Sequence, residues 1–157
     1  MQGLLLEALG GSGIVLIAGT GSIFMGRIRD SATPGQEHTA RAGGYGYRMA
    51  SEAGGYSLGM GAIEAALKIQ DGHRQQATVL DQEVRDYFGL ENLQAITPIL
   101  NPAAGDQASV QENVADLARR VLRAASAGDA VAAALVKGAV ADLADHVRAV
   151  GDRLGIP

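Results

Sequence analysis

The stretch GIVLIAGTGSIFMGR, residues 13–27, decides how the rest of the chain is interpreted. It begins with an apolar run, breaks into four small residues at 19–22, and becomes apolar again before Arg27. Two short apolar runs separated by glycine-containing residues are typical of a β-hairpin. We therefore expect strands over residues 14–18 and 23–28, and the turn residues at 30–35 favour a return of the chain through about 39–42.

The composition limits the kinds of function to consider. The chain has 157 residues, a net charge of −4, 19% charged residues and no cysteine. This length suits a single domain. Because there is no run of Lys or Arg, we expect neither nucleic acid nor a membrane surface as a partner. The absence of cysteine excludes disulfides, thiolate zinc sites and iron–sulfur clusters held by this chain.

The sequence also lacks the usual signals for membranes and metals. No stretch approaches the ~20 apolar residues of a membrane helix, and the first residues lack the basic start and cleavage site of a signal peptide. We therefore expect a cytoplasmic protein. The three histidines, His38, His73 and His146, share no metal-ligand spacing, so they predict no metal site. We expect them to face solvent or to cap helices.

The C-terminal part of the chain shows helical periodicity. A short helix is expected to follow the glycine-rich stretch 43–61 and to end at Asp71-Gly72. Three more helices have start signals at Thr78, Ser109 and Asp129. Prolines interrupt the segment 97–102, which is expected to be a connection. Two apolar stripes with helical spacing should face the core. They are Val110, Val114, Leu117 and Val121, and Val131, Leu135, Leu143, Val147, Val150 and Leu154.

These segments predict an α+β fold, with an N-terminal β-hairpin or small sheet packed with about four helices. A helix-like fragment at residues 4–9 precedes the first strand. We expect residues 1–157 to form a single partial domain, with the hairpin and a glycine-rich motif at 13–46 and a mainly helical region at 47–157. Two strands alone are seldom stable, so the chain is expected to be part of something larger.

The four small residues of the hairpin, Gly19, Thr20, Gly21 and Ser22, are chemically suited to phosphate. Glycine lets the backbone approach a ligand closely, and the amides and hydroxyls of such a turn can donate to phosphate oxygens. The sequence fits neither a P-loop, which needs Lys-Ser/Thr after its last glycine, nor the dinucleotide fingerprint, which needs a helix next. A hairpin turn without any ligand remains the alternative.

Two motifs resemble a known family. IVLIAGTGSIFMGR at 14–27 and RAGGYGYRMASEAGGYSLGMGAIEAAL at 41–67 are similar, in order and spacing, to the C-terminal-domain core of eukaryotic-type N-acetylglucosamine kinases. That family is grouped with the BadF/BadG/BcrA/BcrD-type ATPases in the actin-like superfamily. The resemblance implies a partial ribonuclease H-like domain. It also implies that the hairpin turn holds ATP phosphates, through the hydroxyls of Thr20 and Ser22 and the amides around Gly19 and Gly21.

The second motif looks like the part of the family that contacts the sugar. By resemblance, Gly43, Gly44, Ser51 and Glu52 border the substrate, and Tyr45 replaces a tryptophan of the family. Ser51 stands where the family has an aspartate, which should weaken or change sugar recognition because a carboxylate can accept two sugar hydroxyls. The family's following Gly-Ser pair is Ala53-Gly54 here.

The resemblance implies ATP-dependent phosphorylation of an amino sugar, such as N-acetylglucosamine or glucosamine, with Mg²⁺ bridging the ATP phosphates. No catalytic residue and no metal ligand is assigned to this chain, because the family's first phosphate loop and catalytic Asp have no counterpart before Gly13. We therefore expect this chain to work within a larger two-domain kinase and to be inactive by itself. The alternative is a non-catalytic remnant that binds a nucleotide or a partner. Exposed apolar faces also favour self-association, including a homodimer.

Overall fold

The computed structural model describes residues 7, 11–29, 35–46, 53–73, 76–102 and 107–156. Its sheet has three antiparallel strands in the order β1-β2-β3: β1 is Gly13–Ala18, β2 is Ser22–Arg29 and β3 is Glu37–Gly43. The hairpin register pairs Ala18 with Ser22, directly beside the glycine turn. The expected strands and the small-sheet form of the α+β fold are confirmed.

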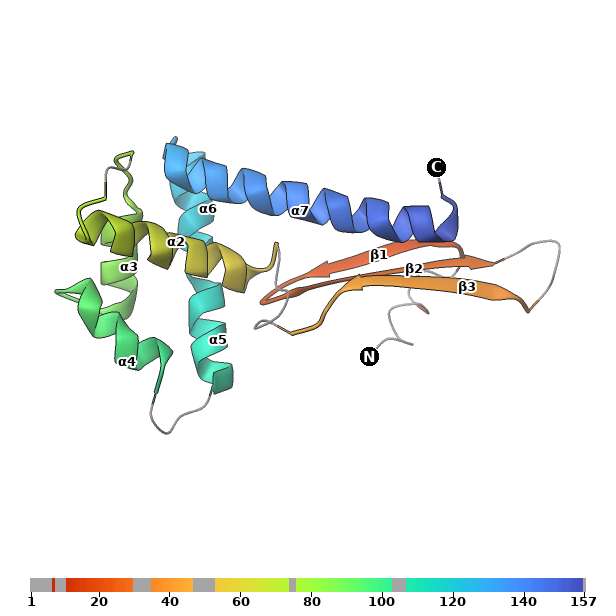
Figure 1. Cartoon of the computed structure of the whole chain (residues 1–157), viewed down its shortest axis with the longest axis horizontal. Coiled ribbons are helices and arrows are strands. Elements are labelled where there is room, and N and C mark those ends of the chain that lie inside the picture. Colours follow the sequence, from red (N-terminus) through yellow and green to blue (C-terminus); the bar gives the residue numbers. More distant parts are fainter. Residues whose placement is uncertain are drawn as a thin grey trace.

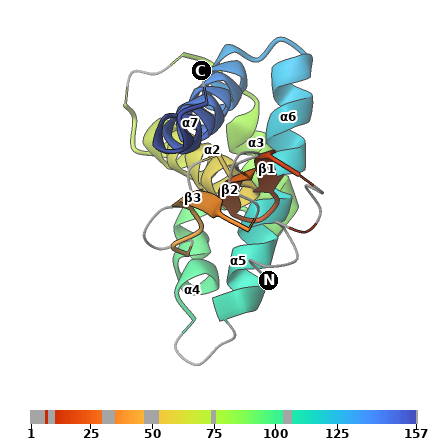
Figure 2. The same cartoon turned by 90° about the vertical axis from the view of Figure 1, so that its right-hand side faces the viewer.

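The remaining described elements are helical and follow the sheet in the chain. They are α2 (Gly55–Gln70), α3 (Leu80–Phe88), the 3₁₀ turn η1 (Leu93–Ala95), α4 (Ile96–Leu100), α5 (Gln107–Asp116), α6 (Ala118–Ser126) and α7 (Ala130–Leu154). The sheet lies at one end of the molecule and a cluster of helices at the other, while α7 runs along both (Figure 1). A view turned by 90° shows that α7 lies over one face of the strands (Figure 2).

Helix α7 joins the two ends because its apolar stripe changes neighbours along its length. Near its C-terminus it packs on β2, where Val150 is fully buried. A Cβ at Gly26 would lie 2.6 Å from Val150 Cγ1, so glycine in β2 allows this close packing. His146 packs against Phe24, with ring centroids 4.8 Å apart and ring planes inclined by 57°. This histidine is half-buried, so the expectation that it faces solvent or caps a helix is wrong.

The helical core forms around α2, whose buried residues include Ala62, Ile63 and Ala66. Val114, Leu117 and Val121 of the first predicted stripe are all fully buried against it. The predicted start of the last helix is also confirmed, since Asp129 Oδ1 accepts a hydrogen bond of 2.9 Å from the Ala132 amide. The periodic pattern therefore identified the inward faces correctly.

Three helix predictions need correction. The helix expected to start at Ser109 already includes Gln107, and it is divided at Leu117 into α5 and α6. The proline-containing connection contains the short helix α4, where Pro98 occupies the first turn and needs no intrahelical N–H partner. Helix α2 begins at Gly55, well inside the glycine-rich stretch. The predicted fragment at 4–9 lies outside the described residues, except for Glu7.

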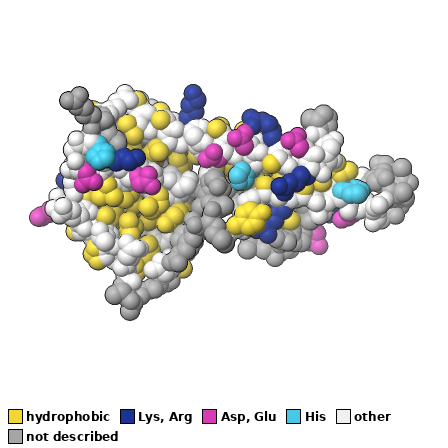
Figure 3. All heavy atoms as spheres, in the orientation of Figure 1, with side chains coloured by type: hydrophobic (Ala, Val, Ile, Leu, Met, Phe, Trp, Pro, Cys, Tyr) yellow, Lys and Arg dark blue, Asp and Glu magenta, His cyan; other side chains and the backbone are white. Residues whose placement is uncertain are grey.

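Charged and apolar side chains are distributed differently over the molecule. On the face shown in Figure 3, basic and acidic groups are interspersed around α7 and the sheet, whereas apolar side chains gather at the helical end. Within the described ranges, no single helix is long and apolar enough to cross a membrane. Segments α5–α6 and α7 have that length and composition only when taken together, and they are bent by 116° relative to each other.

Candidate functional site

The turn between β1 and β2 is closed by its own backbone. The Gly19 amide donates a hydrogen bond of 2.8 Å to the Gly21 carbonyl, immediately after the last strand pair. A Cβ at Gly19 would meet nothing within 4 Å, so space is open on that side. The turn is therefore compact and still accessible to a ligand.

The start of α2 holds the turn from the other side. The Gly55 amide donates to the Gly19 carbonyl at 2.7 Å, and the Tyr56 amide donates to the Thr20 carbonyl at 2.9 Å. The described peptide bonds are trans, and in a trans peptide the C=O and N–H bonds point in opposite directions. The amides of Thr20 and Gly21 consequently point away from α2, where they can donate to an anion.

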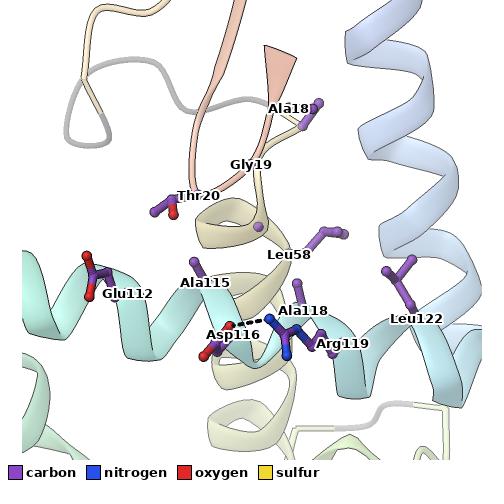
Figure 4. Close-up of a pocket in the computed structure, with 12 residues that line it drawn as sticks. Ala18, Gly19, Thr20, Leu58, Glu112, Ala115, Asp116, Ala118, Arg119 and Leu122 are labelled. Carbon is purple, nitrogen blue, oxygen red and sulfur yellow. Dashed lines mark ion pairs between the residues drawn. The ribbon is translucent and has the colours of Figure 1, made fainter.

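A cleft of about 650 Å³ opens beside the turn (Figure 4). Glycine and small apolar residues form much of its wall, and its charged groups come from α5 and α6. Asp116 and Arg119 form an ion pair of 3.4 Å, and both side chains are exposed. The lining residues are Ala18, Gly19, Thr20, Ala53, Gly55, Leu58, Glu112, Ala115, Asp116, Ala118, Arg119 and Leu122. Its size is that of a site for a small molecule.

The structure brings part of the predicted phosphate set together at this cleft. Gly19 and Thr20 line it, and Gly21 belongs to the same turn. Ser22 does not line the cleft; it begins β2 and is only 7% exposed. Thr20 is therefore the better placed of the two predicted hydroxyls.

The predicted sugar residues lie elsewhere or outside the described chain. Gly43 and Gly44, at the end of β3, have φ angles of 68° and 72°, which favour glycine, and neither lines the cleft. The Arg41 guanidinium donates to the Gly43 carbonyl at 3.2 Å and to the Gly44 carbonyl at 2.5 Å, so it fixes this bend. Ser51 and Glu52 lie outside the described residues.

The neighbouring Tyr45 is an exposed aromatic group beside this bend. Its side chain is 57% exposed, and the Arg41 guanidinium carbon lies 5.3 Å from its ring centroid. This distance is within the range of a cation–π contact. An exposed aromatic ring therefore lies beside a bend whose backbone is held by Arg41.

The contribution of α5 and α6 was not predicted. Glu112, Ala115, Asp116 and Arg119 line the cleft together with the turn, although no motif marks them. Asp116 also influences a residue beyond the cleft. The pKa of Tyr87 is raised above its ordinary value, first by burial of the phenol and then by the negative charge of Asp116, while the positive charges of Arg120 and Arg119 act to lower it. Within the ranges that the structure describes, no three His, Asp or Glu side chains form a candidate metal-binding group.

The three-stranded sheet, the glycine turn and the long covering helix form a partial actin-like ATPase fold. The model of the BadF/BadG/BcrA/BcrD ATPase family matches residues 2–157, and the chain belongs to this family. The family resemblance noted from the sequence is thus confirmed.

Two relatives extend the comparison. The N-acetylmuramic acid/N-acetylglucosamine kinase of Clostridium acetobutylicum is 32% identical over 144 residues, which are 92% of this chain and 44% of that protein. The crystal structure of a protein assigned as an N-acetylglucosamine kinase from Chromobacterium violaceum matches with a TM-score of 0.70 and 29% identity. That match covers 93% of this chain and 46% of the other chain. The chain thus spans less than half the length of either relative.

Proposed function

We propose that this chain forms part of the nucleotide site of an ATP-dependent amino-sugar kinase. The observation that carries the proposal is the turn at Gly19–Gly21, whose carbonyls are held by α2 and whose next amides point away from it beside an open cleft. Backbone amides in such an arrangement bind phosphate oxygens without a cationic side chain. The kinase names of the two relatives support the same reading.

The charges around the cleft favour different positions for the phosphates and for the nucleoside of the nucleotide. Glu112 and Asp116 bring carboxylates to the α5 wall, where they would repel a phosphate. The same oxygens can accept hydrogen bonds from ribose hydroxyls or a base amino group. In this proposal the phosphates therefore lie over the amides of Thr20 and Gly21, and the nucleoside lies toward α5 and α6.

The proposed sugar site and metal follow from the resemblance. The amino sugar would be bordered by Gly43, Gly44, Ser51 and Glu52. Because Ser51 stands in place of the family's aspartate, it would make fewer hydrogen bonds to the sugar hydroxyls. Mg²⁺ is commonly held by substrate phosphates and one or two carboxylates, and it would neutralise charge on the transferred phosphoryl group. This chain would position the nucleotide, and it contains no residue to which we assign proton abstraction from the sugar.

The first test is a calorimetric titration of the chain with Mg-ATP. Thr20→Val removes the hydroxyl at nearly constant shape, and it should weaken binding about three- to tenfold, the value of one neutral hydrogen bond. Thr39→Val, on the exposed part of β3, is the matched control and should bind as the wild type does. Absence of binding by the wild type at millimolar Mg-ATP would contradict the proposed nucleotide site.

A second measurement separates the kinase from a non-catalytic relative. The substitution at Ser51 favours the alternative that the fold binds a nucleotide or partner without turnover. We expect the chain by itself to release no ADP with N-acetylglucosamine, N-acetylmuramic acid or glucosamine. Sugar-dependent ADP release by a longer form of the protein would support the kinase, whereas nucleotide binding without any turnover in that form would support the alternative.

A further inference from the structure

We propose that the N-terminus of α2 positions and polarises the phosphate-binding turn, and that Gly55 is the positioning residue. This inference rests on the proposed function, because it explains how that turn would bind phosphate. The basis is the pair of hydrogen bonds from the Gly55 and Tyr56 amides to the Gly19 and Thr20 carbonyls, at 2.7 and 2.9 Å.

The two bonds use the donors that an α-helix leaves unpaired at its start. The first amides of a helix have no intrahelical acceptor, and the aligned peptide dipoles give this end a partial positive charge. Here the turn's carbonyls accept from the first two residues of α2. The helix end is consequently covered by the turn and acts on a ligand only through it.

The peptide groups of the turn can transmit this effect. A carbonyl that accepts a hydrogen bond polarises its own peptide group, which makes the attached N–H a stronger donor. The Gly19 carbonyl shares a peptide group with the Thr20 amide, and the Thr20 carbonyl shares one with the Gly21 amide. Helix α2 therefore strengthens both outward amides and fixes their direction at the same time.

The glycines at the helix start make this contact close. A Cβ at Gly54 would lie 2.7 Å from both Gly21 Cα and the Thr20 carbonyl oxygen. Gly54 has φ −85° and ψ 167°, a conformation open to most residues, so its glycine serves the contact distance rather than the backbone angle. The sequence thus favours direct docking of the turn on α2.

Gly55 offers a direct way to remove one of the two donors. It is the first residue of α2, a position where proline is common because its N–H is not needed within the helix. Gly54 already has the extended backbone that a residue before proline prefers. Gly55→Pro therefore removes the donor to Gly19 while the helix can still form.

The experiment uses the ¹⁵N-labelled chain and inorganic triphosphate as the probe, followed by amide NMR. For the wild type we expect ligand-dependent shifts at Thr20 and Gly21, together with slower hydrogen exchange at Gly55 and Tyr56. Gly55→Pro should raise the Kd at least about tenfold, as expected when charge-assisted donors are misaligned. Gly55→Ala retains the N–H and should lose less affinity than the proline variant.

Ala130→Pro is the control, since it places proline at the same first position of α7, away from the turn. It should leave the Kd unchanged. Equal Kd values for folded Gly55→Pro and the wild type would overturn the inference. Unchanged exchange at Gly55 and Tyr56 when the wild type binds triphosphate would overturn it too, and this result does not depend on the folding of a variant.

Failure of the proposed function gives a different result. If the wild type binds neither triphosphate nor Mg-ATP, the nucleotide site is wrong. The positioning role of α2 is then tested without ligand, by comparing the Thr20 and Gly21 amide resonances of Gly55→Pro with those of the wild type. Displaced resonances would support the positioning role, and resonances at their wild-type positions would overturn it.

Discussion

The Thr78 hydroxyl donates a hydrogen bond of 2.9 Å to Asp129 Oδ1, and this bond joins two helix starts that are 51 residues apart. The other carboxylate oxygen, Oδ2, accepts from the Val79 amide at 2.8 Å, while Oδ1 also caps α7 through the Ala132 amide. One side chain therefore fixes the beginning of α7 and the approach to α3.

Removal of this carboxylate should destabilise the helical end. Asp129→Ala leaves the amides of Val79 and Ala132 without their acceptor, and we expect a loss of about 2 kcal/mol in the free energy of unfolding. Urea unfolding measures this change. Asp142→Ala, at an exposed position within α7, is the control and should change stability by less than about 0.5 kcal/mol. Equal effects of the two variants would contradict the double cap.

The same carboxylate should make stability depend on acid pH. Partial burial acts to raise the pKa of Asp129, but hydrogen bonds from Ala132, Val79 and Thr78 together lower it below its ordinary value of 3.8. The folded state therefore binds a proton less readily than the unfolded chain does. The resulting stabilisation is fully present above about pH 4 and is lost as the pH falls through the lower pKa of the folded state.

Comparison of the wild type with Asp129→Asn isolates this contribution. The asparagine cannot titrate, so the stability difference between the two proteins should shrink as the pH falls below about 4. Urea unfolding over a series of pH values gives both curves. A difference that stays constant through this range would show that Asp129 has an ordinary pKa in the folded protein.

Ala53 adopts an unfavourable backbone conformation at the edge of the cleft. Its φ is 63°, it is 7% exposed, and among the described residues it is the single non-glycine with a positive φ. Ala53→Gly should stabilise the protein by about 0.5–1 kcal/mol because glycine adopts this angle freely. Ala141→Gly, on the exposed side of α7, should have the opposite sign. Thermal unfolding distinguishes them, and destabilisation by Ala53→Gly would show that the angle is not strained.

Local patterns predicted the strands, the inward stripes and the Asp129 cap, because each depends on residues near one another in sequence. They failed where tertiary contact decides the structure. From the sequence, Gly55 and Gly59 were expected to belong to a loop. They lie in α2, where the absence of a side chain allows close contact with the backbone of α5. The first turn of α4 accepts Pro98, which sequence reading treated as an interruption.

The candidate site shows the same division. The turn that we propose to bind phosphate could be singled out from the sequence because Gly19–Ser22 forms one continuous motif. The wall formed by Glu112, Asp116 and Arg119 was missed, since three charged residues at helical spacing are common on solvated helices. The packing of α2 against α5 brings that surface to the turn, and this contact is not encoded in any local pattern.

The packing of α2 against α5 leads to a prediction in which helix propensity and tertiary contact change the free energy of unfolding in opposite directions. Alanine is a better helix former than glycine by about 1 kcal/mol, so propensity alone predicts that Gly59→Ala stabilises α2. A Cβ at Gly59 would, however, overlap the Val114 carbonyl, and at Gly55 it would lie 3.0 Å from the Ala115 carbonyl oxygen. Backbone atoms cannot move aside as a flexible side chain can.

We therefore expect Gly59→Ala to lower the free energy of unfolding by about 2–3 kcal/mol, the cost of overpacking a close contact. Gly138 is the matched control, because it also lies within a helix but a Cβ there would meet nothing within 4 Å. Gly138→Ala should stabilise the protein by about 0.5–1 kcal/mol. Opposite signs in urea unfolding would establish that α2 and α5 meet through backbone. If both variants are stabilised, α2 lies farther from α5 than the structure places it, and the cleft wall beside the Gly19–Gly21 turn is displaced as well.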